Sequence, residues 1–137
     1  MILSASDGFA QYVAAFNRGD HESYAAFYSP DVVLCNGAGT ELHGRTAIVE
    51  FYERFRTLVH RVMEVKGFVM GHHCLAASLA SRFNILAEQM EFADQNLHKG
   101  DQVDIESIAL YELIDGKFSA IHATTMSRNI RRAGHAA

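Results

Sequence analysis

The chain has 137 residues and is 49% hydrophobic, which is enough to bury one core of ordinary size but not two. Its formal net charge of -4 and its scattered basic residues argue against a nucleic-acid partner. No apolar run approaches the roughly 18 residues of a membrane span, and the N-terminal sequence lacks a secretory signal. We therefore expect one cytoplasmic domain over residues 1–137, without membrane association and with a flexible tail over about residues 128–137.

The first half of the chain carries apolar residues at helical spacing. They predict a first helix over residues 5–18, which ends before a glycine, and a short second helix that Asp20 can cap. The lone proline then favours an extended chain, which predicts a strand over residues 32–35. From Thr46 onward, an apolar face at helical spacing predicts a longer third helix that ends near Glu64.

The second half changes to the spacing of strands. Apolar or alternating segments predict strands over residues 65–70, 75–90, 103–114 and 118–127. Helices followed by strands predict an α+β fold. Asp115 and Gly116 lie between the last two segments and predict a two-residue hairpin, because a type I′ turn requires positive φ at both central positions.

This hairpin predicts the register of the last two strands. Counted outward from the turn, Leu113 faces Phe118, Tyr111 faces Ala120, Ala109 faces His122 and Ser107 faces Thr124. These pairs share the more apolar side of the sheet. His122 and Thr124 are therefore expected to point toward the core.

The other side of the same sheet combines acidic residues with an apolar centre. Its expected members are Asp104, Glu106, Ile108, Leu110, Glu112 and Ile121. This centre is too apolar for a surface that is fully in contact with water. We therefore expect a homodimer that forms through this face of the sheet.

Two motifs link the chain to a known family. The pattern GxxxxGRxAIxxFY covers Gly39–Tyr52, and DGK follows at Asp115–Lys117. Together with the predicted order of helices and strands, these motifs resemble the SnoaL-like (polyketide cyclase-like) branch of the nuclear transport factor 2-like (NTF2-like) superfamily. The resemblance extends over nearly the whole chain. It implies a cone-shaped fold in which three N-terminal helices pack on a curved antiparallel sheet.

The first half also resembles a ketosteroid isomerase, in which a tyrosine and a protonated aspartic acid stabilise an oxyanion while another aspartate moves the proton. The resemblance implies that Tyr12 is the oxyanion-binding tyrosine and that Tyr28 and Tyr52 support it. Asn36 stands where the proton-moving aspartate is expected, and an amide cannot take up a proton at neutral pH. The second acid is expected within residues 108–110, none of which is acidic. Steroid isomerisation by that mechanism is therefore not expected.

Each candidate residue also has a purely structural interpretation. Tyrosines at helical spacing are often core residues with a satisfied hydroxyl. Asn36 could hydrogen-bond a carbonyl ligand or only close the turn before Gly37. His122 could act as an acid or base near pH 7 or could be a packed core residue. The histidines lack the spacing of metal ligands and no phosphate-binding glycine loop occurs, so neither a metal nor a cofactor is expected.

The sequence thus predicts an apolar cavity that holds a small, mostly hydrophobic molecule. Its expected lining is Phe9, Tyr12, Phe16, Phe51, Phe55, Phe83, Tyr111 and Met126. The ligand-binding candidates are Phe16, Tyr28, Phe51, Tyr52, Phe55, Phe83, Tyr111 and Thr124. The leading hypothesis is a cofactor-free isomerase, cyclase or dehydratase for a carbonyl compound, in which Tyr12 and Asn36 donate to the oxyanion and His122 moves the proton. The alternative is a non-catalytic module for ligand binding or dimeric assembly.

Overall fold

The computed structural model of the chain describes residues 5–92 and 94–134. The helices in these ranges are α1 (Ala5–Arg18), α2 (His21–Ala25) and α3 (Arg45–Phe55). The strands are β1 (Tyr28–Cys35), β2 (Glu41–His43), β3 (Val59–Met70), β4 (Cys74–Ile85), β5 (Gln89–Phe92), β6 (Gln95–His98), β7 (Gln102–Ile114) and β8 (Lys117–Arg131). The predicted α+β class is confirmed, and α1 covers the residues that its apolar spacing predicts.

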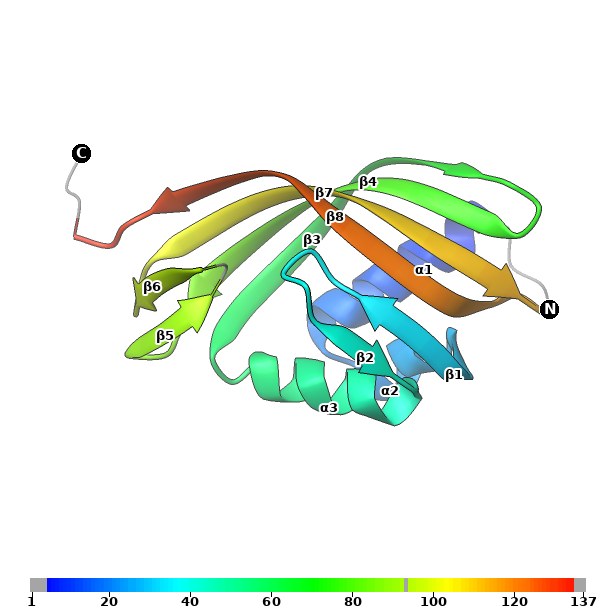
Figure 1. The fold of residues 1–137 in the computed structure, drawn as a ribbon, viewed down its shortest axis with the longest axis horizontal. Helices are drawn as coiled ribbons and strands as arrows, with labels where there is room; N and C mark the ends of the chain where they lie inside the picture. Colours follow the sequence, from blue (N-terminus) through cyan, green and yellow to red (C-terminus); the bar gives the residue numbers. More distant parts are fainter. Residues whose placement is uncertain (1–4, 93, 135–137) are drawn as a thin grey trace.

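A six-stranded sheet with the order β2-β1-β8-β7-β4-β3 forms the body of the fold, and β5 pairs with β6 in a separate two-stranded sheet. β1 runs parallel to β8 while the other neighbours are antiparallel, so the large sheet is mixed and not purely antiparallel as expected. No turn signal predicts the parallel pair, because its partners, such as Leu34 and Ile121, are far apart in the sequence. The sheet curves over the helices, as the cone-shaped fold requires (Figure 1).

Bulges bend the long strands and change their register. The pairing of β3 with β4 shifts between Val65 and Gly67, and the pairing of β7 with β8 shifts at two places. A bulge adds one residue to one strand, which bends that strand and increases its twist. The sheet therefore wraps around the helices instead of lying flat.

One of these bulges contradicts the predicted register of β7 and β8. The pairing begins as expected beside the hairpin, but the extra residue Ser119 then moves the partners by one position as far as Thr125. His122 pairs with Leu110 as a result, and Thr124 pairs with Ile108. Both His122 and Thr124 are exposed on the convex face of the sheet, so the prediction that they point toward the core is wrong.

The third helix is shorter than predicted. α3 ends at Phe55, and β3 begins at Val59 within the segment that was expected to be helical. No glycine or proline separates the two elements, so the helical spacing of α3 runs without a break into the alternation of β3.

Two strand ends also differ from the prediction. β4 stops at Ile85, and β5 carries the last residues of the segment predicted as one strand. β8 continues to Arg131, which pairs with Gln102, so residues 128–131 belong to a strand and not to a flexible tail. Residues 135–137 of the expected tail lie outside the described part of the chain.

The core lies between the helices and the concave face of the sheet. Aromatic rings meet around Tyr12, whose ring centre is 5.0 Å from that of Phe118 and 5.8 Å from that of Tyr28. Ile121 is also buried in this core at 4% exposure, which contradicts its expected place on the other face. The same bulge at Ser119 explains this difference, because it turns Ile121 inward.

Candidate functional site

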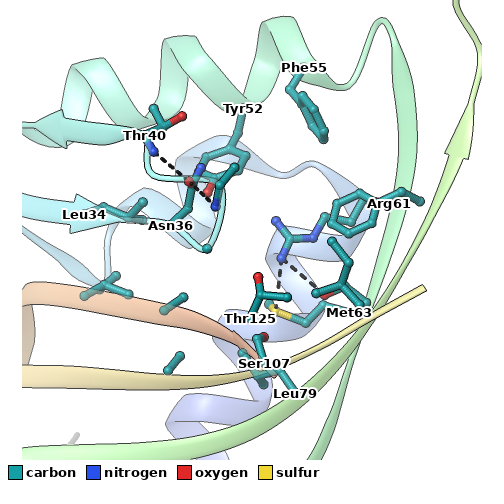
Figure 2. Close-up of a pocket in the computed structure, with 18 of the residues that line it drawn as sticks. Leu34, Asn36, Thr40, Tyr52, Phe55, Arg61, Met63, Leu79, Ser107 and Thr125 are labelled. Atoms are coloured by element: carbon teal, nitrogen blue, oxygen red, sulfur yellow. Dashed lines mark hydrogen bonds between the residues drawn. The ribbon is translucent and has the colours of Figure 1, made fainter. Parts of the chain in front are cut away.

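A cavity of about 380 Å³ lies between the helices and the concave face of the sheet. Figure 2 shows part of its wall, with side chains from α3 on one side and from β3, β4, β7 and β8 on the other. Most of the wall is apolar. The polar side chains that line it belong to Tyr12, Asn36, Thr40, Tyr52, Arg61, Ser81, Glu91, Ser107, Tyr111, Thr125 and Arg128.

The mouth of the cavity is marked by its exposed lining residues. These are Gly37 and Ala38 in the β1–β2 turn, Glu91 in β5 and Arg128 near the end of β8. The other lining residues are buried or half-buried. A ligand would therefore enter between the β1–β2 turn and the β5–β6 hairpin.

Most of the site residues predicted from the sequence meet in this cavity. Those that line it are Tyr12, Phe16, Asn36, Phe51, Tyr52, Phe55, Phe83 and Tyr111. Tyr28 is fully buried and is not a lining residue, but its hydroxyl is hydrogen-bonded to that of Tyr12, which is. Phe9 packs in the core against Tyr111, with ring centres 5.2 Å apart, and is not part of the lining.

Three further predicted residues lie outside the cavity. The bulge at Ser119 turns His122 and Thr124 away from it. A second bulge inserts Met126, whose side chain is 65% exposed. The predictions that His122 moves a proton here, that Thr124 binds the ligand and that Met126 lines the wall are therefore wrong.

Tyr12 and Tyr28 form a hydrogen-bonded pair, with hydroxyl oxygens 2.8 Å apart. Burial, and then the neighbouring hydroxyls of Tyr28 and Tyr111, raise the pKa of Tyr12 well above its usual value. Burial also raises the pKa of Tyr28. Both phenols therefore keep their protons near neutral pH. When Tyr28 donates to Tyr12, the proton of Tyr12 is available to a ligand in the cavity.

The other two tyrosines of the first half have different partners. Tyr52 contributes its ring to the wall and packs edge-on against Phe16, with ring centres 5.0 Å apart. Tyr24, which the sequence did not single out, donates from its hydroxyl to Glu53 at 3.2 Å. In the described part of the chain, the hydrogen-bond partner of the Tyr12 hydroxyl is thus Tyr28 and not Tyr52.

Asn36 closes the turn that follows β1. Its side-chain oxygen accepts hydrogen bonds from the backbone N–H groups of Ala38 and Thr40, at 3.1 and 3.0 Å. Asn36 therefore has the structural role considered above, which is to close the turn before Gly37. The two hydrogen bonds also fix the orientation of its amide. The Nδ2 group has no protein partner among residues 5–92 and 94–134, so it can still donate to a ligand.

Arg61 is a lining residue that the sequence did not reveal. It belongs to β3, pairs with Phe83 and points to the concave face. Asn17 of α1 fixes this strand, because its amide donates to the carbonyl of Met63 and accepts from its N–H, both at 2.8 Å. The alternation that begins at Val59 is the signal that could have identified the strand, since it puts Arg61 and Met63 on the same side.

The guanidinium group of Arg61 lies inside the cavity without an acidic partner (Figure 2). Its central carbon is 4.9 Å from the ring centre of Phe83 and 5.4 Å from that of Phe16. Nη2 donates to the hydroxyl of Ser81 at 3.2 Å and lies 4.0 Å from the sulfur of Met63. Nε is buried and has no hydrogen-bond partner within the described residues. No ion pair joins Arg61 to a carboxylate of these residues.

The cavity is rich in hydrogen-bond donors and poor in acids. Glu91 is the only carboxylate among the described lining residues, and no histidine or aspartate is among them. Tyr12, Asn36 and Arg61 can all donate into the space. Such a set favours a ligand oxygen that carries or develops negative charge.

Residues 5–92 and 94–134 contain neither a cluster of metal ligands nor a membrane-spanning helix. No group of three or more His, Cys, Asp or Glu side chains is arranged there to hold a metal ion. No helix in these ranges is long and apolar enough to cross a membrane.

Several solved structures share this fold. The chain is similar to a SnoaL-like polyketide cyclase from Agrobacterium tumefaciens strain C58, with a TM-score of 0.74 and 15% identity over 90% of this chain and 92% of that chain. It is similar to an LEH-like epoxide hydrolase from M. tuberculosis, with a TM-score of 0.70 and 12% identity over 87% of this chain and 80% of the other. An NTF2-like protein from Cytophaga hutchinsonii ATCC 33406 gives a TM-score of 0.66 and 11% identity, with coverage of 91% and 92%. No curated protein sequence matches the chain.

At such low identities these structures show a shared fold and not a shared activity. They confirm the NTF2-like architecture that the motifs predict. Residues 9–121 match the SnoaL-like domain family, and this range includes both Gly39–Tyr52 and Asp115–Lys117. The chain therefore belongs to the SnoaL-like domain family.

Proposed function

We propose that the chain binds a small, mostly hydrophobic molecule that carries a carbonyl or similar oxygen group. The cavity is the observation that carries this proposal, because ligand sites are typically concave and apolar with a few convergent polar groups. The rings of Phe51, Phe55 and Phe83 would contact the hydrophobic body of the ligand. Tyr12 and Asn36 would donate to its oxygen.

Catalysis is a second candidate that the same donors support. A cofactor-free isomerase, cyclase or dehydratase needs donors where negative charge develops on a carbonyl oxygen. It also needs a group that moves a proton, and Glu91 is the carboxylate that lines the cavity. A SnoaL-like polyketide cyclase shares the fold of the chain at 15% identity. Recovery of a chemically altered compound after incubation would distinguish catalysis from binding alone.

A neutral apolar fluorophore tests the binding proposal. N-phenyl-1-naphthylamine fluoresces more strongly in apolar surroundings, and we expect it to bind the purified protein saturably. Ser107→Phe puts a ring into the cavity and should weaken this binding on the order of tenfold. Ile108→Phe is the matched control, because the adjacent side chain points to the convex face and is 42% exposed. Equal effects of the two variants would mean that the fluorophore binds elsewhere and would contradict the proposal.

We further propose that the convex face of the sheet pairs with a second copy of the chain. Ile108 and Leu110 lie near the middle of this face, and each is 42% exposed. Charges of both signs lie farther along the same face, where Arg82 donates to Asp104 at 2.9 Å. A face with an apolar centre and both signs of charge can complement itself across a two-fold axis.

A further inference from the structure

We propose that Arg61 makes the cavity selective for an anion, so that the ligand is a hydrophobic molecule with a carboxylate or an enolate-type oxygen. This inference rests on the proposed function, because it names the class of molecule that the same cavity takes. It gives a role to a half-buried cation whose Nε is buried and which no ion pair of the described chain neutralises.

A buried charge is normally paired with an opposite charge, because removal from water is costly. A guanidinium group does not lose its proton in proteins, so pairing with an anion is the way to neutralise its charge. In the described residues its neighbours are two aromatic rings, a thioether and a hydroxyl, none of which is charged. Glu91 lines the same cavity but forms no ion pair with Arg61. Arg61 therefore brings into the cavity a positive charge that no ion pair of the described residues neutralises.

The surroundings of Arg61 hold its guanidinium group in place for a ligand. Phe83 and Phe16 offer their ring faces to the cation, and Ser81 accepts from Nη2. Nη1 makes no protein hydrogen bond in the described part of the chain, and Nε is buried without a partner. Because the side chain is already held, little conformational freedom would be lost when an anion binds.

The rest of the cavity defines the other half of the ligand. Phe51, Phe55 and Phe92 supply aromatic surface, and Phe92 comes from the β5–β6 hairpin at the mouth. Charge-assisted hydrogen bonds from Arg61 would fix the acidic end of the molecule. A neutral hydrocarbon would satisfy the aromatic wall but would leave the cation unpaired. The class that satisfies both is a compact hydrophobic acid or a stabilised enolate.

Two fluorophores that differ in one acidic group test this inference. 1-Anilinonaphthalene-8-sulfonate has the ring system of N-phenyl-1-naphthylamine plus a sulfonate, which stands in for the carboxylate. We expect the protein to bind the sulfonate about tenfold or more tightly than the neutral compound. Arg61→Met should abolish this preference while affinity for the neutral compound stays within roughly twofold of the unaltered protein.

Three controls accompany the measurement. Arg82→Met removes an arginine from the convex face of the neighbouring strand, and it should leave the preference unchanged. Ser107→Phe should weaken the binding of both compounds. Thermal unfolding should show that Arg61→Met is folded and at least as stable as the unaltered chain, because the variant lacks the unpaired cation. Arg61→Gln provides a second neutral variant if Arg61→Met does not fold.

The outcomes distinguish a failure of the proposed selectivity for an anion from a failure of the proposed ligand site. Equal affinity for the two compounds, or a preference that survives in Arg61→Met, would overturn the selectivity for an anion and leave the hydrophobic ligand site intact. Failure of the neutral compound to bind, together with sulfonate binding that Ser107→Phe does not weaken, would overturn the ligand site itself.

Discussion

The hydroxyl groups of Tyr12 and Tyr28 depend on each other. Both rings are buried, and the 2.8 Å contact between their oxygens is the hydrogen bond that compensates for the loss of water at both groups. A buried hydroxyl that loses its partner costs about 1–3 kcal/mol. Replacing one tyrosine therefore affects the other.

We expect Tyr12→Phe and Tyr28→Phe each to lower the free energy of unfolding by about 1 kcal/mol or more. The double variant should lose less than the sum of the single losses, because it leaves neither hydroxyl unpaired. Urea denaturation of the four proteins measures this coupling. Tyr24→Phe serves as the control, since its hydroxyl donates to Glu53 and its effect should add to that of Tyr12→Phe. Additive losses for Tyr12 and Tyr28 would show that their hydrogen bond contributes nothing.

At the scale of helices and strands, regular elements were predictable and bulges were not. The apolar period of α1 is unbroken and gave its bounds. The hairpin at Asp115 and Gly116 was predictable because both residues adopt positive φ, of 52° and 77°. The bulge at Ser119 has no comparable local signal, because the apolar alternation continues on both sides of the inserted residue. His122 was misplaced for this reason.

The sequence did not reveal Arg61 as a lining residue, because the apolar residues of a short segment can fit both the spacing of a helix and that of a strand. Apolar residues from Phe55 to Met63 agree with a helical face, and they agree equally with an alternating strand. Pairing with β4 decides between the two, and this pairing is a tertiary interaction. By contrast, the aromatic wall from α1 and α3 was predictable, because it requires only the face of each helix.

Asp101 connects the end of β8 to the turn between β6 and β7. It is 3% exposed and accepts hydrogen bonds from the N–H groups of His98 and Ala133, at 2.9 and 2.8 Å, and from Arg132 at 3.2 Å. Burial alone would raise the pKa of this carboxyl, but the hydrogen bonds outweigh it and hold the pKa below its usual value. The ionised form is therefore the one that the fold stabilises.

We expect Asp101→Asn to lower the free energy of unfolding at pH 7 by about 1–3 kcal/mol, because a neutral amide cannot accept as strongly from three donors. A lowered pKa gives stability that is fully present above the pKa of the unfolded chain and is lost as pH falls through the lower pKa of the folded protein. The difference between the variant and the unaltered chain should therefore shrink below about pH 4. Urea denaturation at pH 7 and at pH 3 measures both effects, with the exposed Glu88→Gln as control. A difference that stays constant with pH would contradict the role of the ionised carboxyl.

At the scale of the whole molecule, the convex face of the sheet is the candidate for self-association. We expect the protein to sediment as a dimer at micromolar concentration and Leu110→Lys to shift it to a monomer, because a charge would be buried at the centre of the contact. Ile114→Lys is the control, since this residue is 62% exposed but lies at the hairpin end of β7. An unaltered chain that sediments as a clean monomer would exclude this dimer.

The location of the mouth also has an evolutionary consequence. The cavity opens between the β1–β2 turn and the β5–β6 hairpin, and the hairpin is separate from the six-stranded sheet. Substitutions in such peripheral segments are tolerated more easily than substitutions in long paired strands. Related chains could therefore acquire new chemical preferences by altering a few residues around the opening, while the scaffold that carries Tyr12, Tyr28 and Arg61 stays the same.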